Sequence, residues 1–158
     1  MTKRIHEKDI DQIREIIRPL LGSSAWNVKI GIGTFITMEF GNQISISPRD
    51  KRGEWYLWIY YAGWFLENPK GISIGSEDKR DILKKEVKVL EGCRLVDILI
   101  YNSAFETKFV FDDGIILHTF PLHIVDDWES WELFTPDKKV LILYPSGKWD
   151  YKPANLID

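Results

Sequence analysis

Apolar residues recur at helical spacing near the start of the chain, with charged residues on the opposite face. The apolar positions of this segment are Ile10, Ile13, Ile17 and Leu20. The pattern predicts an N-terminal helix that stops at Gly22, because glycine is common just after a helix C-terminus. Pro19 lies inside the pattern, and we expect it to shorten or kink the last turn because it has no N–H group.

Alternation with a period of two then predicts strands. Gly41-Asn42 predicts a turn with a returning strand behind it, and "KRGE" (51–54) predicts a second turn into an aromatic strand over residues 55–67. Both faces of that strand are apolar or aromatic. Such a strand is either covered on both sides or meets a ligand or partner on one side. Two interpretations therefore stay open, a core strand and the wall of an aromatic pocket.

A second helix is expected from Ser76, a good N-cap residue, to Gly92. Further strands follow, with turns at Asp113-Gly114, "PDKK" and "PSGK". Strands in two blocks around one central helix predict an α+β fold. We expect a mostly antiparallel curved sheet or a partial barrel, with an N-terminal helix and a central helix. No internal repeat or linker is evident, so residues 1–158 are expected to form a single domain.

Composition narrows the functional classes. The net charge is −3, so the broad basic field that nucleic-acid binding requires is absent, and we expect no nucleic-acid partner. Cys93 is the only cysteine, so no internal disulfide can form, which favours a reducing compartment. No apolar run approaches a membrane span, and the N-terminus does not resemble a signal peptide. The expected location is the cytoplasm, with no membrane partner.

Candidate catalytic and metal-binding residues do not form a recognisable motif. His118 and His123 have donor atoms that suit zinc or iron, but their spacing matches no closed ligand set, so metal binding by them is left open. Glu39 and Glu54 lie beside aromatic residues, as carboxylates of a sugar hydrolase do. Cys93 lacks an identifiable base nearby in the sequence. We therefore expect no enzyme, no cofactor and no metal.

The segment from Phe109 to Pro136 contains six acidic residues and neither Lys nor Arg. Its "DDWESWE" portion alternates acids with tryptophans. Carboxylates steer a basic partner, and tryptophan supplies anchoring area. The predicted partner-binding residues are Asp126, Asp127, Trp128, Glu129, Trp131 and Glu132.

Several motifs support a resemblance that extends over nearly the whole chain. They are "GIGTFITMEFG", "GEWYLWIYYAGWFLE", "GSEDKRDILKKEVKVLEGCRL" and the C-terminal "WELFTPDKKVL" with "WDY". Together they resemble a small, uncharacterised family of bacterial proteins. In size, acidity and lack of a catalytic motif, the chain also resembles immunity proteins of bacterial polymorphic or contact-dependent toxins.

That second resemblance implies a non-enzymatic module that neutralises a cognate toxin by covering its basic active-site face. The alternatives are a small-molecule-binding protein with an aromatic pocket and a hydrolase that uses Glu39, Glu54 or His118.

Overall fold

The described part of the chain forms eleven strands in two antiparallel sheets, which share one apolar core with two short helical segments. The computed structural model describes residues 7–101 and 104–154. The six-stranded sheet has the order β1 (Ala25–Ile30), β2 (Ile36–Ser45), β3 (Lys51–Ile59), β9 (Trp131–Phe134), β10 (Lys139–Leu143) and β11 (Trp149–Pro153). The five-stranded sheet has the order β5 (Gly71–Gly75), β4 (Ala62–Asn68), β8 (Ile116–Pro121), β7 (Thr107–Phe111) and β6 (Leu95–Ile100). This architecture confirms the α+β prediction, and the described strands do not close into a barrel.

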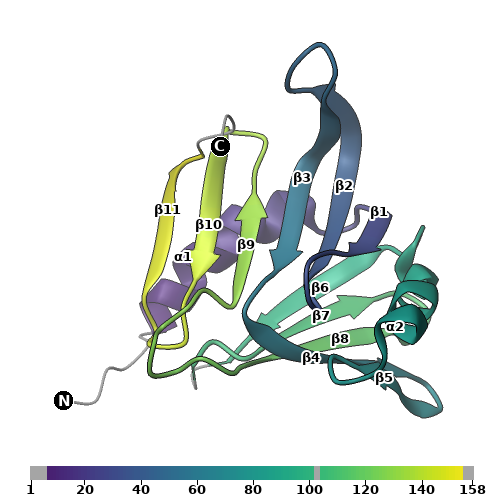
Figure 1. The fold of residues 1–158 in the computed structure, drawn as a ribbon. Helices are drawn as coiled ribbons and strands as arrows, with labels where there is room; N and C mark the ends of the chain where they lie inside the picture. Colours follow the sequence, from purple (N-terminus) through teal and green to yellow (C-terminus); the bar gives the residue numbers. More distant parts are fainter. Residues whose placement is uncertain (1–6, 102–103, 155–158) are drawn as a thin grey trace.

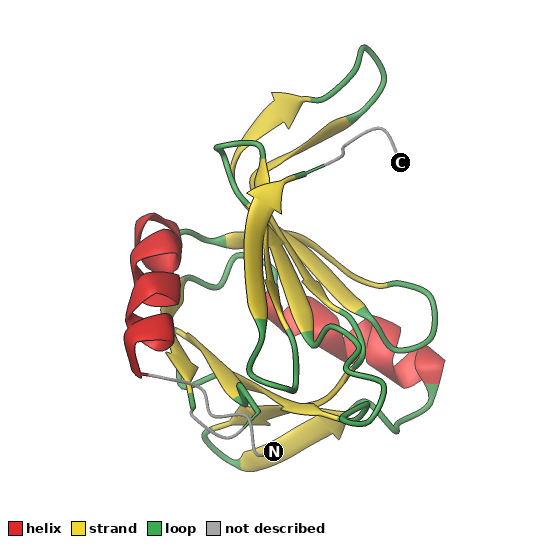
Figure 2. Ribbon diagram, turned by 90° about the vertical axis from the view of Figure 1, so that its left-hand side faces the viewer, coloured by secondary structure: helices red, strands yellow, loops and turns green. Residues whose placement is uncertain are grey.

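The two sheets meet at a steep angle and pack through their inner faces (Figure 2). Trp131 of β9 packs edge-on against Phe109 of β7, with ring centroids 5.5 Å apart. The Trp131 indole N–H also donates to Thr107 Oγ1 at 3.0 Å, so the contact between the sheets is both apolar and hydrogen-bonded. Helix α1 (Glu7–Ile17) lies behind the six-stranded sheet and α2 (Arg80–Glu86) lies beside β5 (Figure 1).

The aromatic segment forms two strands instead of the single strand that the pattern predicted. In β3 the odd-numbered residues Trp55, Leu57 and Ile59 are buried, whereas in β4 the even-numbered residues Trp64 and Leu66 are buried. The parity changes at Tyr60 and Tyr61, where the chain leaves one sheet and enters the other. The crossing turns a different face of each strand toward the same core, which explains why both faces of the segment read as apolar.

The hairpin turn between β2 and β3 also differs from the prediction. Gly41-Asn42 lies inside β2 at a bulge, with Gly41 at a positive φ of 78°. The chain reverses farther on, between Ser47 and Asp50, where the Asp50 backbone N–H donates to Ser47 Oγ at 3.1 Å. Residues 51–54 are therefore the start of β3. As a result, the β2–β3 hairpin is longer than expected and projects beyond the rest of the molecule (Figure 1).

Close packing at Gly53 gives a testable prediction about this hairpin. A Cβ at Gly53 would lie 2.7 Å from the Phe40 carbonyl oxygen, which belongs to the backbone and cannot move aside easily. We expect Gly53→Ala to lower the free energy of unfolding by about 1–3 kcal/mol. Gly31→Ala is the matched control, because a Cβ there would meet Phe35 only at 3.8 Å or beyond. Urea titration of both variants decides the point, and equal stability would contradict the packing argument.

Both predicted helices form, but the second one begins later in the chain than expected. Helix α1 ends at Ile17, and Pro19 lies within the 3₁₀ turn (Arg18–Leu20) that follows, which is the shortening expected of that proline. Helix α2 begins at Arg80, after the Lys79 N-cap, and a 3₁₀ turn (Val87–Leu90) extends it. Ser76 does not cap it, because its Oγ accepts a hydrogen bond from the Trp64 backbone N–H at 3.1 Å.

The two halves of the chain contain an internal repeat that the sequence pattern did not show. In each half, a helix with a 3₁₀ turn leads into two antiparallel strands, α1 into β1–β2 and α2 into β6–β7. Ser24 and Arg94 form an isolated bridge where the halves meet. Reciprocal backbone hydrogen bonds flank it: Gly22 N to Leu95 O and Gly92 N to Ala25 O, both 2.7 Å, and Ala25 N to Cys93 O and Leu95 N to Ser23 O, both 2.9 Å. This reciprocity is that of an approximate two-fold axis.

The helices of the described ranges are all too short or too polar to cross a membrane.

Candidate functional site

The outer face of the six-stranded sheet carries a continuous strip of rings. Strand register places Tyr56 opposite Phe134 and Trp58 opposite Glu132, while Tyr60 continues the line beyond the end of β3. Trp58 stacks on Tyr60 with centroids 5.6 Å apart and meets Phe134 edge-on at 5.4 Å. We call Tyr56, Trp58, Tyr60 and Phe134 the aromatic face. Helix α1 packs on the opposite side of the sheet, where Trp149 donates to Asp9 Oδ1, so the helix leaves the aromatic face open (Figures 1 and 2).

Three carboxylates gather beside the aromatic face, and we call Glu129, Glu132 and Asp150 the acid cluster. Burial, together with repulsion from Glu129, raises the pKa of Glu132 to about 7, while Lys152 acts in the opposite direction. The pKa of Tyr144 is raised by burial and then by all three carboxylates of the cluster. All three carboxylates influence the same tyrosine, so they lie on one patch. Burial of this patch makes negative charge there costly.

An unpaired donor adjoins this patch. The Trp58 indole N–H is buried and has no hydrogen-bond partner in the described structure. Burial also raises the pKa of Tyr60, with further contributions from Tyr61, Glu132 and Glu129. A buried donor without a partner costs free energy, which a bound molecule with a suitable acceptor would recover.

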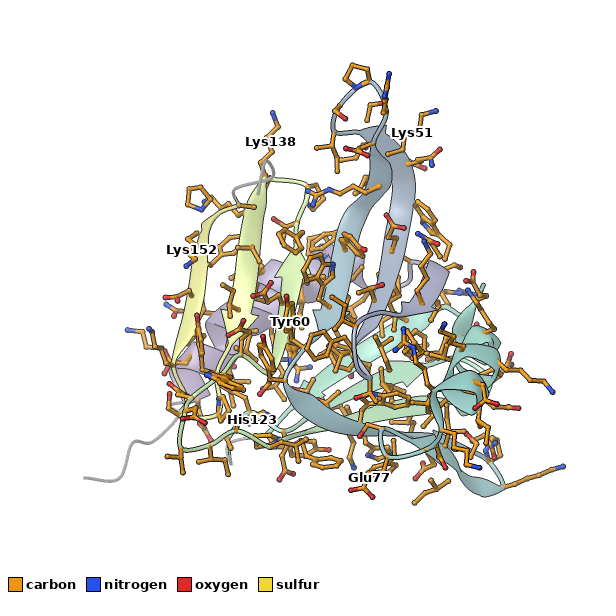
Figure 3. All side chains as sticks on the ribbon, in the orientation of Figure 1. Lys51, Tyr60, Glu77, His123, Lys138 and Lys152 are labelled. Carbon is orange, nitrogen blue, oxygen red and sulfur yellow. The ribbon has the colours of Figure 1, made fainter. Side chains whose placement is uncertain are left out.

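The loop between β8 and β9 exposes a run of apolar side chains, which we call the apolar loop: Leu122, Ile124, Val125 and Trp128. Val125 is 97% exposed and Trp128 is 44% exposed. The Trp128 ring lies 5.0 Å from Tyr61, which in turn lies 4.8 Å from Tyr60. The apolar loop is therefore continuous with the aromatic face, and Figure 3 shows Tyr60 at the end of β3 above the loop that bears His123.

The structure brings four of the six predicted partner-binding residues to this surface. Asp126 and Trp128 are exposed on the apolar loop, and Glu129 and Glu132 belong to the acid cluster. Asp127 has a structural role, because its carboxylate accepts hydrogen bonds from the Ser146 backbone N–H at 2.8 Å and from the Ser146 hydroxyl at 2.7 Å. It anchors the apolar loop to the β10–β11 turn.

The inclusion of Trp131 in the binding surface was wrong. Its side chain is 0% exposed and belongs to the core between the sheets. Alternation along β9 explains the error, because Trp131 and Leu133 point inward while Glu132 and Phe134 point outward. The sequence shows this alternation, and it would have identified Phe134 as the aromatic residue that shares a face with Glu132.

The residues considered for hydrolysis do not converge. The Glu39 carboxylate is buried and accepts hydrogen bonds from the Gly53 backbone N–H and the Asn27 side-chain amide, so it supports the β2 bulge. Glu54 accepts from the Asn42 backbone N–H at 3.2 Å. His118 lies on the other sheet, stacked on Phe65 with ring centroids 4.2 Å apart. The structure therefore provides no shared site for these three groups.

The two histidines considered as metal ligands contact different parts of the structure. His123 packs against Trp128 on the apolar loop, with ring centroids 4.6 Å apart, whereas His118 faces Glu67 on the outer side of β8. Within residues 7–101 and 104–154, no group of three or more His, Cys, Asp or Glu side chains could hold a metal ion.

Burial and the carboxylates of Asp112 and Asp113 raise the pKa of the Cys93 thiol, which disfavours a reactive thiolate.

The acid cluster predicts a pH-dependent stability. The pKa of Glu132 is about 7 in the folded protein against 4.5 for an ordinary glutamate. The folded state therefore disfavours the ionised carboxylate, which destabilises the protein fully above pH 7 and not at all below pH 4.5. We expect Glu132→Gln to stabilise the protein at pH 8 by about 1 kcal/mol, a value that allows for solvent screening of a partly exposed side chain. Unfolding curves at pH 4 should show no such gain.

Glu106→Gln, at an exposed site just before β7 of the other sheet, serves as the control and should show no difference at either pH. An equal gain for Glu132→Gln at pH 4 and pH 8 would contradict the assignment of the shifted pKa.

The structure therefore offers an open surface that is both acidic and aromatic. No protein-family model, curated protein or solved structure matches this chain.

Proposed function

We propose that the protein is a non-enzymatic binding module whose aromatic face, acid cluster and apolar loop together dock onto a basic surface of a protein partner. The observation that carries the proposal is the apolar loop, where Val125 is nearly fully exposed and Trp128 is partly exposed. Exposed apolar side chains in contiguous patches are typical of interaction surfaces. Here the patch continues into stacked rings and ends at three carboxylates.

Each part of this surface contributes differently to binding. Tyr and Trp side chains provide large contact areas at a small cost in conformational entropy, and they are enriched among residues that dominate interface energetics. The acid cluster attracts a positively charged partner and orients its approach. A lysine or arginine placed against Glu132 would favour its ionised form and offset the repulsion from Glu129. A basic partner therefore gains both contact area and a charge match.

The biological role that we propose is that of a cytoplasmic immunity protein for a bacterial toxin. Nuclease toxins bind phosphate groups and have basic active-site faces, so an acidic aromatic surface would occlude such a face without any catalytic step. The resemblance in character to immunity proteins supports this role, as does the failure of Glu39, Glu54 and His118 to converge.

The proposal predicts that a gene beside this one encodes a toxin-like protein, and that protein, once identified and purified, serves as the partner in the test. Purified wild-type protein should bind it and inhibit its activity at a ratio of one to one. Glu129→Lys/Glu132→Lys should weaken binding at least tenfold and flatten the salt dependence of the association rate. The control is Glu77→Lys/Glu106→Lys, which makes the same change in net charge at exposed sites away from the proposed surface.

Equal weakening by the two double variants would show that only net charge matters, which would refute docking at the acid cluster. Failure of the wild-type protein to bind or inhibit the neighbouring toxin would remove the proposed role in immunity.

A further inference from the structure

The outer face of the six-stranded sheet also borders a cavity, which lies at the β2–β3 hairpin. The β2–β3 hairpin and the β9–β10 turn enclose a cavity of about 480 Å³. This volume falls in the range typical of small-molecule sites. Figure 3 labels Lys51 on the hairpin and Lys138 on the opposing turn. The cavity is lined by Ile44, Ser45, Ile46, Ser47, Asp50, Arg52, Thr135, Pro136 and Lys138.

Arg52 is the unusual member of this lining. Its side chain is only 6% exposed, and its guanidinium carbon lies 5.3 Å from the centroid of the Phe134 ring. Its Nε–H has no hydrogen-bond partner, and no carboxylate of the described residues forms a salt bridge with it. Burial lowers its pKa, an effect that the electrostatic influence of Glu39 and Tyr56 opposes. A buried guanidinium without a bonded anion is costly, so its presence requires an explanation.

The rest of the lining complements a negative group. Lys138 supplies a second positive charge at the cavity, and Ser45 supplies a hydroxyl group. The one acid in the lining, Asp50, is engaged within the hairpin turn, where its Oδ2 accepts from the Ser47 hydroxyl at 3.2 Å. The apolar part of the wall comes from Ile44, Ile46 and Pro136.

We propose that this cavity binds a small molecule through a phosphate or carboxylate group held by Arg52, with the apolar part of the ligand against the hairpin. The planar guanidinium fork matches either oxyanion, and its stacking on Phe134 fixes its orientation. The proposed site differs from the aromatic pocket considered from the sequence, because the cavity lies at the end of the aromatic strand rather than along it. It does not rest on the proposed protein partner, because the acid cluster and apolar loop are not part of the cavity.

The experiment uses four probes at constant ionic strength: inorganic phosphate, phenyl phosphate, acetate and benzoate, with chloride as the reference anion. The readout is the NMR signal of the Arg52 side-chain Nε–H, together with calorimetric affinity. We expect a saturable shift with the phosphates, the carboxylates or both, which identifies the oxyanion. The aromatic probe of the preferred pair should bind at least tenfold more tightly than the bare ion, because it also contacts the apolar wall.

Arg52→Gln should abolish binding, and Arg52→Lys should weaken it at least tenfold because the fork is lost. Lys138→Gln, at an exposed position, should weaken binding severalfold and provides a test even if the Arg52 variants fail to fold. Lys51→Gln is the matched control and should bind within twofold of wild type, because Lys51 does not line the cavity. No shift with any probe, or equal binding by Arg52→Gln and wild type, would overturn the proposal.

Discussion

Replacing Trp131 with alanine is expected to lower the free energy of unfolding by about 3–5 kcal/mol. The indole is fully buried between the sheets, so its removal leaves a cavity that the packed rings around it cannot fill. The change also leaves the Thr107 hydroxyl without its indole donor. Urea or thermal unfolding followed by far-UV circular dichroism measures the loss.

Trp128→Ala is the matched control, because it removes the same side chain from the same segment. Trp128 is 44% exposed and its ring packs only at the surface, against Tyr61 and His123, so we expect a loss of less than about 1 kcal/mol. Comparable losses for the two variants would mean that the core and surface assignments of these tryptophans are wrong.

Trp58→Ala is expected to weaken partner binding by about 30-fold or more, since central tryptophans of interfaces cost about 2 kcal/mol or more when truncated. Trp58 lies in the middle of the aromatic face, between Tyr60 and Phe134, and its indole N–H lacks an acceptor in the free protein. Calorimetric titration with the proposed toxin partner measures the change.

Tyr101→Ala provides the comparison, because Tyr101 is an exposed aromatic residue that borders the outer face of the other sheet. It should leave the affinity within twofold. A strong loss with Tyr101→Ala and none with Trp58→Ala would place the interface on the five-stranded sheet.

Periodicity was enough to predict the α+β class and the helices, because one buried stripe with a fixed period defines each element. The turn at Asp113-Gly114 was predictable for a similar reason, since both residues adopt positive φ, of 60° and 72°. The aromatic segment was not, because two strands of opposite parity follow each other without a polar break. Only the strand pairing shows that the chain changes sheets at Tyr60 and Tyr61.

The candidate site was predictable only in part. An excess of acids located Glu129 and Glu132, but the sheet register was needed to separate outward Glu132 from inward Trp131. Arg52 was missed because a single arginine in a turn-like sequence gives no sign of burial. Its place beside Phe134 depends on strands that lie about 80 positions apart in the chain. The internal repeat was hidden because backbone hydrogen bonds relate the halves while most side chains differ.

We propose that the outer face of the six-stranded sheet binds a basic protein. Carbene footprinting of the protein alone and in complex with the proposed toxin partner is the decisive test, because labelling reports the accessibility of individual side chains. We predict strong protection of Trp58, Tyr60, Val125 and Trp128 in the complex, with unchanged labelling of Tyr101 and Phe120. Protection of Tyr101 and Phe120 while Trp58 and Val125 stay fully labelled would contradict the account.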